Sequence, residues 1–400
     1  MALESFLDLQ TLEVSGKNVF LRLDLNVPLK DGKILDKTRI EAALPTLKNL
    51  VERGARLVVA SHLGRPKTDE DRQRLSLEPV ARALNEEGFE VLLMETADSE
   101  APYELLKGLS GKQVILLENL RFDEGETQNS QTLAAKWAKY TDIYVNDAFG
   151  ASHRSHASID ALAQLIPERC YGALIEKELD FLKKVKDEPA KPFVLLTGGS
   201  KVSDKLPLLE SLAGSVDTFV IGGAMAYTFL KASGKSVGAS LVEEDKISVA
   251  KNFLSQMQVA GKKVLLPVDH IVVPDFKSDD WSETSNENIH GKDVAVDIGP
   301  RTIALYADEL KKAGSVFWNG PMGVYERPPF NKGSLAMAKA LAESPAFTVV
   351  GGGDSAAAAK DSGFAGDMDH ISTGGGASLE FIQGVKLPGI EALKVRRASE

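Results

Sequence analysis

Short apolar runs recur along the whole chain, and stretches with helical spacing of apolar residues separate many of them. One such stretch places Leu44, Leu47 and Leu50 three residues apart. Strands that are apolar on both faces are typical of parallel sheets whose two faces are covered by helices. The alternation therefore predicts an α/β fold. The expected strands lie at 19–25, 56–61, 91–94, 114–117, 143–145, 193–196, 218–221, 264–266, 294–298, 316–318 and 348–350.

The chain is long enough for two domains. Its 400 residues exceed what one hydrophobic core usually supports. A helical stripe of Ile175, Leu179, Leu182 and Val185 is followed by a charged segment with two prolines at 186–192. We therefore expect a first domain over 1–172, a connecting helix over 173–188 and a second domain over 189–385. Each domain is predicted to be a doubly wound, Rossmann-like parallel sheet, and the helix and a hinge join the two.

The composition argues against several partners and locations. A formal net charge of −10 disfavours nucleic acid or an anionic membrane as the main partner. The single cysteine, Cys170, rules out an internal disulfide bond and fits a reducing compartment. No uncharged run approaches the length of a membrane span, and the first residues lack the features of a secretion signal. We expect a cytoplasmic protein, with a stromal protein after processing as the alternative. Because the sequence shows no long exposed apolar stripe, we expect a monomer.

Arginine recurs after the strand ends in the first half of the chain, although the protein is acidic overall. Ligands of open parallel sheets bind beyond the carboxyl ends of the strands. A guanidinium group is permanently charged and planar, which suits bidentate bonds to carboxylate and phosphate. Each arginine alone is more simply a solvated charge or a structural ion pair, but their recurrence predicts a site for a small, multiply anionic metabolite. The residues concerned are Arg22, Asp24, Asn26, Arg39, His62, Arg65, Arg121 and Arg154.

A glycine turn with two lysines follows the apolar run 193–196. The turn, Gly198-Gly199-Ser200-Lys201-Val202-Ser203-Asp204-Lys205, leads into a segment that can be helical. Backbone N–H groups at a helix start are expected to point outward unpaired, where they favour anions. Lysines four residues apart lie on one helical face and can converge on a polyanion. The turn therefore predicts a phosphate cradle; the alternative is an ordinary strand-to-helix turn with two solvated lysines.

Further glycine-rich turns in the second half extend this prediction. They lie at 222–225, 319–326, 351–355 and 373–377. Glycine lets the backbone approach a ligand closely and presents N–H groups to phosphate oxygens. Asp354, beside one of these turns, is suited to hold Mg²⁺ on phosphate oxygens. The second half is therefore expected to bind a nucleotide.

Two familiar nucleotide motifs do not explain these turns. A P-loop needs glycine five residues before its Gly-Lys-Ser end, but Phe229 holds that position relative to Gly234-Lys235-Ser236. The run 351–356 fits the glycine pattern of dinucleotide-binding enzymes. However, the segment about 20 residues further on is Ser-Thr-Gly-Gly-Gly, without the acid that would hold a ribose. A hydride-transfer enzyme is therefore a less favoured alternative.

Seven segments carry a resemblance to a known family. They are Leu-Arg-Leu-Asp-Leu-Asn-Val-Pro (21–28), Ser-His-Leu-Gly-Arg-Pro (61–66), Glu-Asn-Leu-Arg-Phe (118–122), Ser-His-Arg-Ser-His-Ala-Ser (152–158), the lysine turn (198–205), Trp-Asn-Gly-Pro-Met-Gly-Val-Tyr-Glu (318–326) and Gly-Gly-Gly-Asp-Ser (351–355). In this order they resemble the signature segments of phosphoglycerate kinases. The segment 387–393 resembles that family's tail, so 386–400 is expected to return to the first domain. Two residues depart from the pattern of that family: Leu25 lies where phenylalanine is common, and Ser355 lies where threonine is common.

The resemblance implies a phosphotransferase whose acceptor is a carboxyl group. Such an enzyme moves a phosphoryl group reversibly between ATP and 3-phosphoglycerate, with Mg²⁺, giving ADP and 1,3-bisphosphoglycerate by in-line transfer on domain closure. The implied catalytic residues are Arg39, Lys205, Gly375 and Gly376. The implied substrate-binding residues are Arg22, Asp24, Leu25, Asn26, Arg39, His62, Leu63, Gly64, Arg65, Arg121 and Arg154. The implied nucleotide-binding residues are Gly199, Lys201, Lys205, Gly222, Gly223, Asn319, Pro321, Glu326, Gly352, Gly353, Asp354 and Ser355, and Asp354 is also the implied metal ligand.

A non-catalytic, nucleotide-dependent binding protein that kept this fold is the alternative from another class. The lysine, arginine and acidic positions of the resemblance are all filled, which favours an enzyme. An assay for ATP-dependent turnover of 3-phosphoglycerate distinguishes the two.

Overall fold

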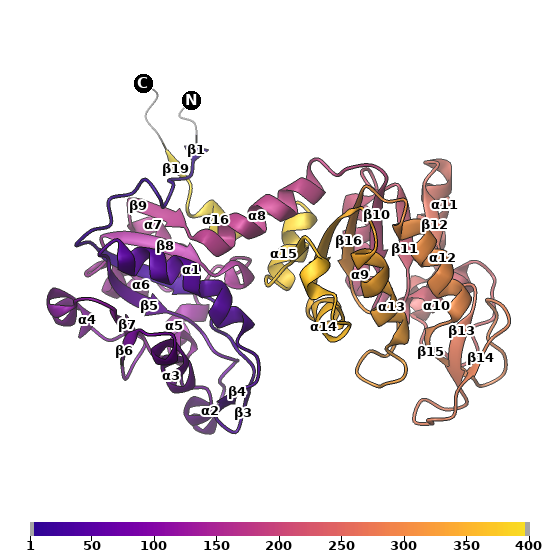
Figure 1. The fold of residues 1–400 in the computed structure, drawn as a ribbon, viewed down its shortest axis with the longest axis horizontal. Helices are drawn as coiled ribbons and strands as arrows, with labels where there is room; N and C mark the ends of the chain where they lie inside the picture. The colour runs from indigo at the N-terminus through magenta and orange to yellow at the C-terminus, as the bar shows by residue number, and fades with distance from the viewer. Residues whose placement is uncertain (1–3, 397–400) are drawn as a thin grey trace. The chain divides into compact units, whose positions relative to one another are not determined.

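The structure is a computed structural model that describes residues 4–396 (Figure 1). Within these residues the chain divides into two compact units: unit 1 holds residues 4–179 and 386–396, and unit 2 holds residues 180–385. The division falls inside the helix α8 (Ala173–Lys186), which carries the apolar stripe seen in the sequence. Residues 1–3 and the last four residues of the predicted returning tail, 397–400, lie outside the described residues.

Unit 1 is built on a six-stranded parallel sheet. Its order is β6-β7-β5-β2-β8-β9, so the chain starts near the middle and winds outward on both sides. In the register of β2, Leu21 lies between Val59 of β5 and Val145 of β8. The strands are β2 (Asn18–Leu23), β5 (Arg56–Ala60), β6 (Glu90–Leu93), β7 (Gln113–Leu116), β8 (Ile143–Asp147) and β9 (Glu168–Tyr171).

Successive residues of β2 face opposite sides of this sheet. Leu21 packs with the apolar face of α1 (Thr38–Glu52) and α3 (Glu78–Glu86), whereas Phe20 packs with α6 (Gln131–Ala138) and α7 (Leu162–Leu165). The same alternation puts Arg22 on the side of Phe20. The other elements of unit 1 are β1 (Glu4–Ser5), β3 (Leu29–Lys30), β4 (Lys33–Ile34), α2 (Asp69–Arg74), α4 (Pro102–Leu105), η1 (Leu106–Gly108), η2 (Leu120–Phe122), α5 (Glu124–Thr127), η3 (Phe149–Ala151), the π-helical turn η4 (Ala157–Ala161), α16 (Pro388–Glu391) and β19 (Val395–Arg396).

The described part of the tail belongs to unit 1. β19 pairs antiparallel with β1, and Figure 1 shows the two strands side by side. Earlier in the tail, the backbone N–H of Gly389 donates to the Ser152 carbonyl over 2.8 Å, and Asn146 Nδ2 donates to the Gly389 carbonyl over 3.1 Å. Leu393 is fully buried in the cluster that contains Phe20.

Unit 2 repeats this architecture with a second six-stranded parallel sheet. Its order is β12-β11-β10-β16-β17-β18. Val220 packs against α12, α13 and α14 on one face, while Phe219 on the other face meets Phe253 of α11 edge-on, with ring centroids 5.2 Å apart. The elements are β10 (Phe193–Thr197), α9 (Val202–Leu212), β11 (Thr218–Ile221), α10 (Met225–Ala232), η5 (Glu244–Lys246), α11 (Ile247–Val259), β12 (Lys263–Leu265), α12 (Pro300–Leu310), β16 (Ser315–Asn319), α13 (Lys332–Ala342), β17 (Phe347–Gly351), α14 (Gly353–Asp361), η6 (Ala365–Asp367), β18 (His370–Ile371) and α15 (Gly376–Ile382).

One expected strand lies outside the parallel sheets. β15 (Val294–Ile298) was expected among the parallel strands, but it pairs antiparallel with β13 (His270–Val273), which also pairs with β14 (Ser282–Glu283). The prediction of a parallel environment for 294–298 is therefore wrong, although the strand itself exists. Its apolar run resembles a parallel strand because residues on both faces are buried: Val296 packs with Phe330, and Ala295 with Tyr227.

Candidate functional site

Unit 1 gathers six basic side chains near the carboxyl ends of its strands. This basic cluster consists of Arg22, Arg39, His62, Arg65, Arg121 and Arg154. Arg22 lies within β2, His62 follows β5, Arg121 lies in η2, and Arg39 is in the first turn of α1. Loop contacts order the site: the backbone N–H of Gly64 donates to Asn26 Oδ1 over 2.8 Å, and a guanidinium nitrogen of Arg121 donates to the Gly64 carbonyl.

The positive charges of the basic cluster repel one another. Burial, and then the charges of Arg154 and Arg22, lowers the pKa of Arg121 to about 10. Burial, and then the positive charges of the neighbouring arginines of the cluster, holds the pKa of His62 well below its usual value. Arg39 forms an ion pair with Asp24, which is only 6% exposed. Because mutual repulsion of cations is relieved by a bound anion, the cluster suits a ligand with several negative charges.

Three of the predicted substrate-binding side chains, those of Arg22, Leu25 and Leu63, are buried. Arg22 is fully buried and reaches the site only through His62, whose Nδ1 lies 3.1 Å from an Arg22 guanidinium nitrogen. The side chains of Leu25 and Leu63 are part of the hydrophobic core. The Leu25 N–H donates to Ser61 Oγ over 2.9 Å, and the Leu63 N–H donates to Asn119 Oδ1 over 3.1 Å. The two leucines position the loops that follow β2 and β5, and Arg22 contacts the basic cluster through His62.

Unit 2 contains a polar pocket of about 350 Å³ at the carboxyl ends of β10, β16 and β17. We call it the phosphate pocket. It brings together most of the residues predicted to contact nucleotide phosphates. Its lining is Gly199, Ser200, Lys201, Asp204, Lys205, Asn319, Gly320, Pro321, Gly352, Gly353, Asp354, Ser355, Gly375, Gly376 and Leu379.

The two lysines of the turn differ in their environment. Lys201 is exposed at the N-cap of α9, whereas Lys205 is partly buried and donates a hydrogen bond to Asn319 Oδ1. Burial lowers the pKa of Lys205, and the nearby carboxylates of Asp204 and Asp354 oppose that shift. A partly desolvated ammonium group binds phosphate oxygens more strongly than an exposed one, because less water screens the interaction.

The start of α9 differs from the sequence-based expectation. The carboxylate of Glu243 accepts hydrogen bonds from the backbone N–H groups of Val202 and Ser203, the latter over 3.0 Å, and from the Ser203 hydroxyl over 2.6 Å. These N–H groups are therefore not directed at a ligand, and the expectation that they are unpaired is wrong. A carboxylate forty residues away in the sequence fills the anion position that a helix N-terminus favours. The positive charge of the pocket comes mainly from its lysines.

Glycine is required where the loops of the phosphate pocket approach one another. A Cβ on Gly320, whose φ is +101°, would lie 2.3 Å from the Gly198 carbonyl oxygen. A Cβ on Gly223, whose φ is +65°, would lie 2.4 Å from the backbone nitrogen of Gly199. Both positions have backbone conformations that other residues rarely adopt. Gly222 packs against Met322 and lines neither the phosphate pocket nor the adjoining pocket described below.

Two exposed carboxylates, Asp204 and Asp354, line the phosphate pocket, and Asp354 is the predicted metal ligand. It lies in the first turn of α14, is exposed, and has no hydrogen bond or ion pair among residues 4–396. Within the same residues no group of three or more His, Cys, Asp or Glu could enclose a metal ion. Mg²⁺ is commonly held by one or two carboxylates together with substrate phosphates and water, so a single carboxylate fits it. Ser355, by contrast, is buried, and its Oγ accepts the N–H of Gly320 over 2.6 Å.

A second, more apolar pocket of about 290 Å³ adjoins the phosphate pocket. The two share Gly199, Ser200, Pro321 and Asp354. The predicted residues Gly223 and Glu326 line it. Its apolar walls are formed by Ala224, Tyr227, Leu241, Phe276, Val294, Ala295, Val296 and Val324, of which only Ala224 and Val324 lie in the glycine-rich turns predicted to bind a nucleotide. Leu241 and Phe276 are half-exposed apolar side chains, and a flat aromatic group of a ligand can cover them. The sequence did not reveal these two residues because they lie in loops that carry no recognisable motif.

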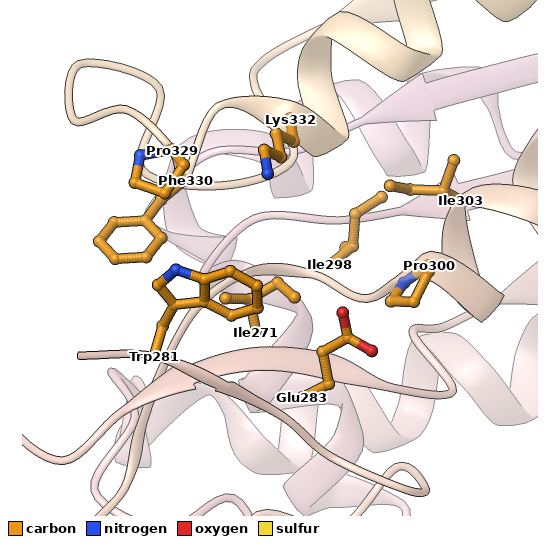
Figure 2. Close-up of a pocket in the computed structure, with 9 residues that line it drawn as sticks. All are labelled: Ile271, Trp281, Glu283, Ile298, Pro300, Ile303, Pro329, Phe330 and Lys332. Carbon is orange, nitrogen blue, oxygen red and sulfur yellow. The ribbon is translucent and has the colours of Figure 1, made fainter. Parts of the chain in front are cut away.

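A third pocket, of about 110 Å³, shares no lining residue with the first two (Figure 2). Trp281 and Phe330 form one side, and Ile298, Pro300 and Ile303 form the other. The Lys332 ammonium lies 5.7 Å from the centre of the Trp281 ring. The pocket contains none of the predicted site residues and is smaller than the roughly 300–1,000 Å³ of typical ligand pockets.

Across residues 4–396, no helix is both long and apolar enough to cross a bilayer.

Comparisons with known proteins give one consistent result. The family model described as phosphoglycerate kinase matches residues 9–385. Phosphoglycerate kinase of Bdellovibrio bacteriovorus is 53% identical over 386 residues, which cover 96% of each chain. The Clostridium botulinum enzyme of the same name is 48% identical over 388 residues, 96% of this chain and 98% of its own. The structure of phosphoglycerate kinase from Coxiella burnetii superposes with a TM-score of 0.85 at 40% identity, covering 97% of this chain and 99% of that one.

Proposed function

Because the chain belongs to the phosphoglycerate kinase family, we propose that its basic cluster binds 3-phosphoglycerate and its phosphate pocket binds ATP or ADP. The enzyme transfers a phosphoryl group reversibly between ATP and 3-phosphoglycerate, giving ADP and 1,3-bisphosphoglycerate. The observation that carries the assignment of sites is the separation of charges: unit 1 presents guanidinium groups, and unit 2 presents glycine loops with Lys205 and Asp354. A triose acid with a phosphate fits the former, and a polyphosphate with Mg²⁺ fits the latter.

The reaction requires that the two substrates be positioned and that their negative charge be neutralised. The acceptor is a carboxylate, which is already ionised at neutral pH and needs no strong general base. The barrier is therefore lowered by holding both anions in line and by stabilising charge on the transferring group. In unit 1 this role falls to Arg39, and in unit 2 to Lys205 and the backbone at Gly375 and Gly376.

Magnesium is the proposed metal, with Asp354 as its protein ligand. When bound, the ion would neutralise charge on the phosphate oxygens. The apolar pocket beside the phosphate pocket is the proposed position of the nucleoside, with Glu326 near the ribose and Phe276 and Leu241 against the base. The buried residues Arg22, Leu25 and Leu63 act indirectly in this scheme, through the loops and side chains they support.

A cytoplasmic monomer is the proposed form of the enzyme. Burial raises the pKa of the single cysteine, Cys170, to about 12, so this thiol is inert and offers no link to a second chain. A net charge of −10 disfavours nucleic acid and anionic membranes as partners, which leaves the small-molecule substrates.

The first test separates the two ligand sites. Lys205→Ala is expected to weaken nucleotide binding about 10- to 100-fold, because a charge-assisted hydrogen bond contributes about 1.5–3 kcal/mol. Binding of 3-phosphoglycerate should stay within twofold of the parent. Calorimetric titration of each ligand measures both. Lys251→Ala, which removes an exposed lysine of α11 outside the pockets, is the control and should change neither constant. Equal losses for the two ligands would contradict the assignment of separate sites.

The second test concerns motion. Transfer requires ligands bound by different units to come together and water to be excluded from the phosphoryl group. We therefore expect the radius of gyration, measured by small-angle scattering, to decrease when both ligands are bound and to decrease less with either one. A radius that stays constant with both ligands at saturation would argue against domain closure.

A further inference from the structure

Behind the basic cluster lies a fully buried acid that the sequence reasoning did not single out. We propose that this residue, Glu126, is a positioning residue for the triose site: it fixes Arg22 so that His62 presents an Nε2–H donor to the ligand. The inference rests on the proposed function, since it concerns the same site. It assigns to Glu126, Arg22 and Ser158 a task that none of them performs by touching the substrate.

Glu126 is held from several sides. It lies in the short helix α5, and its side chain has no exposed area. Its Oε1 accepts the hydroxyl of Ser158 over 2.7 Å, and its Oε2 accepts the Ser158 N–H over 2.9 Å. Nδ1 of His156 lies 3.6 Å from Oε1. Burial opposes the negative charge, but the contacts with His156, Arg22 and Ser158 outweigh it and lower the pKa of Glu126. The group is therefore a carboxylate at neutral pH.

Arg22 is the partner of this carboxylate. One of its terminal nitrogens lies 3.9 Å from Glu126 Oε1, and both side chains are completely buried. Its Nε donates to Ser158 Oγ over 2.8 Å, so the serine hydroxyl bridges the guanidinium and the carboxylate. Another nitrogen donates to the Leu23 carbonyl. A buried cation without a counter-charge is strongly destabilising, which makes Glu126 the residue that allows Arg22 to remain at this position.

The fixed guanidinium determines the state of His62. A nitrogen of Arg22 lies 3.1 Å from His62 Nδ1, and a guanidinium can only donate. Nδ1 must therefore be the acceptor, which places the ring proton on Nε2. Burial, and then the positive charges of Arg22, Arg121, Arg39 and Arg154, lowers the His62 pKa and keeps the ring neutral. Within residues 4–396 the ring has no other hydrogen bond, so Nε2–H is available to a substrate oxygen.

The test uses Glu126→Gln, which keeps the shape of the side chain and removes its charge. Arg22 then loses its counter-charge and is expected to leave Nδ1 of His62. Binding of 3-phosphoglycerate alone, measured by calorimetry, should weaken about tenfold, while nucleotide binding stays unchanged. Nitrogen-15 NMR of the unliganded protein gives a second readout. The parent should show His62 Nδ1 unprotonated and Nε2 protonated, and the variant should show a mixture of tautomers.

Two further variants separate positioning from general stability. Asp147→Asn also alters a fully buried carboxylate of unit 1, but this carboxylate is held by the start of α8, where it accepts the Ile175 N–H over 3.0 Å, and by Thr46. It should change the melting temperature and leave 3-phosphoglycerate affinity and the His62 signals as they are. Ser158→Ala keeps the charge of Glu126 and removes the bridge to Arg22, so a loss of affinity of a few-fold is expected.

Several outcomes would overturn the proposal. A protonated Nδ1 on His62 in the parent does so directly, and this readout remains informative if Glu126→Gln does not fold. Parent-like affinity for 3-phosphoglycerate in both Glu126→Gln and Ser158→Ala, or an equal loss of affinity in Asp147→Asn, also contradicts it. The proposed function fails separately, through absence of 3-phosphoglycerate binding or turnover in the parent, and the tautomer of the unliganded ring does not depend on that result.

Discussion

Arg39→Ala is expected to lower kcat by about 100-fold or more, with a smaller effect on the KM for 3-phosphoglycerate. Arg39 is half-buried in the first turn of α1 and paired with Asp24. Its planar fork is suited to stabilise charge that accumulates on the transferring phosphoryl group more than charge on either bound ground state. An interaction that is stronger in the transition state raises kcat, whereas equal binding of both states changes only KM. Steady-state kinetics with both substrates varied measures the split.

The controls for this variant separate lost catalysis from lost structure. Removing Arg39 leaves Asp24 as a nearly buried carboxylate without its cation, which by itself destabilises the site. Arg39→Lys keeps a positive charge near Asp24 but not the fork, so it should recover stability while kcat stays well below the parent value. Arg82→Ala, which removes an exposed ion pair of α3 with Glu78, should leave kcat and KM unchanged. A rise in KM with parent-like kcat would make Arg39 an ordinary binding residue.

The fold was largely predictable because each parallel strand carries its own local signal. A run such as 193–196 is apolar on both faces, and that alone indicates a strand buried between helix layers. β15 shows that a local apolar pattern does not determine which strand its partner will be. Its run is equally apolar, but its antiparallel partner β13 is chosen by contacts with residues distant in sequence, such as Phe330. Two-residue strands such as β18 have too few residues to show any pattern.

The sequence indicated candidate site residues by their type and position in the chain, but it did not indicate their exposure. Arg22 was grouped with Arg121 by residue type, yet it lies within β2, and strand alternation turns it toward Ser158 and away from solvent. Glu126 and Glu243 escaped notice because each acts on a segment more than thirty residues away, and no spacing in a single sequence reveals such a pair. In both cases a carboxylate satisfies a buried or oriented donor, so the missing information is the tertiary partner.

Asp354→Asn is expected to remove most activity at ordinary Mg²⁺ concentrations, a loss of more than about 100-fold. Even the outer partners of metal ligands commonly contribute 10- to 100-fold to metal affinity or activity, and Asp354 is proposed as a direct ligand. A hard divalent cation prefers a charged oxygen, and an amide oxygen replaces that charge poorly. Within residues 4–396 no group of three or more His, Cys, Asp or Glu could replace it, and Asp204 is the other carboxylate in the lining of the phosphate pocket. A titration of activity with Mg²⁺ should show partial recovery at high concentration.

Nucleotide binding with and without metal decides whether Asp354 acts through the ion. If it does, Asp354→Asn should weaken binding of Mg²⁺-ADP and leave binding of metal-free ADP close to that of the parent, or improve it, since a negative charge beside the phosphates is lost. Asp367→Asn, at an exposed aspartate of η6 outside the lining of the phosphate pocket, is the matched control and should change neither constant. Parent-like activity of Asp354→Asn across the whole Mg²⁺ titration would remove Asp354 from the metal site. Equal losses for both forms of ADP would make it a residue that shapes the pocket, because only a metal ligand distinguishes the two.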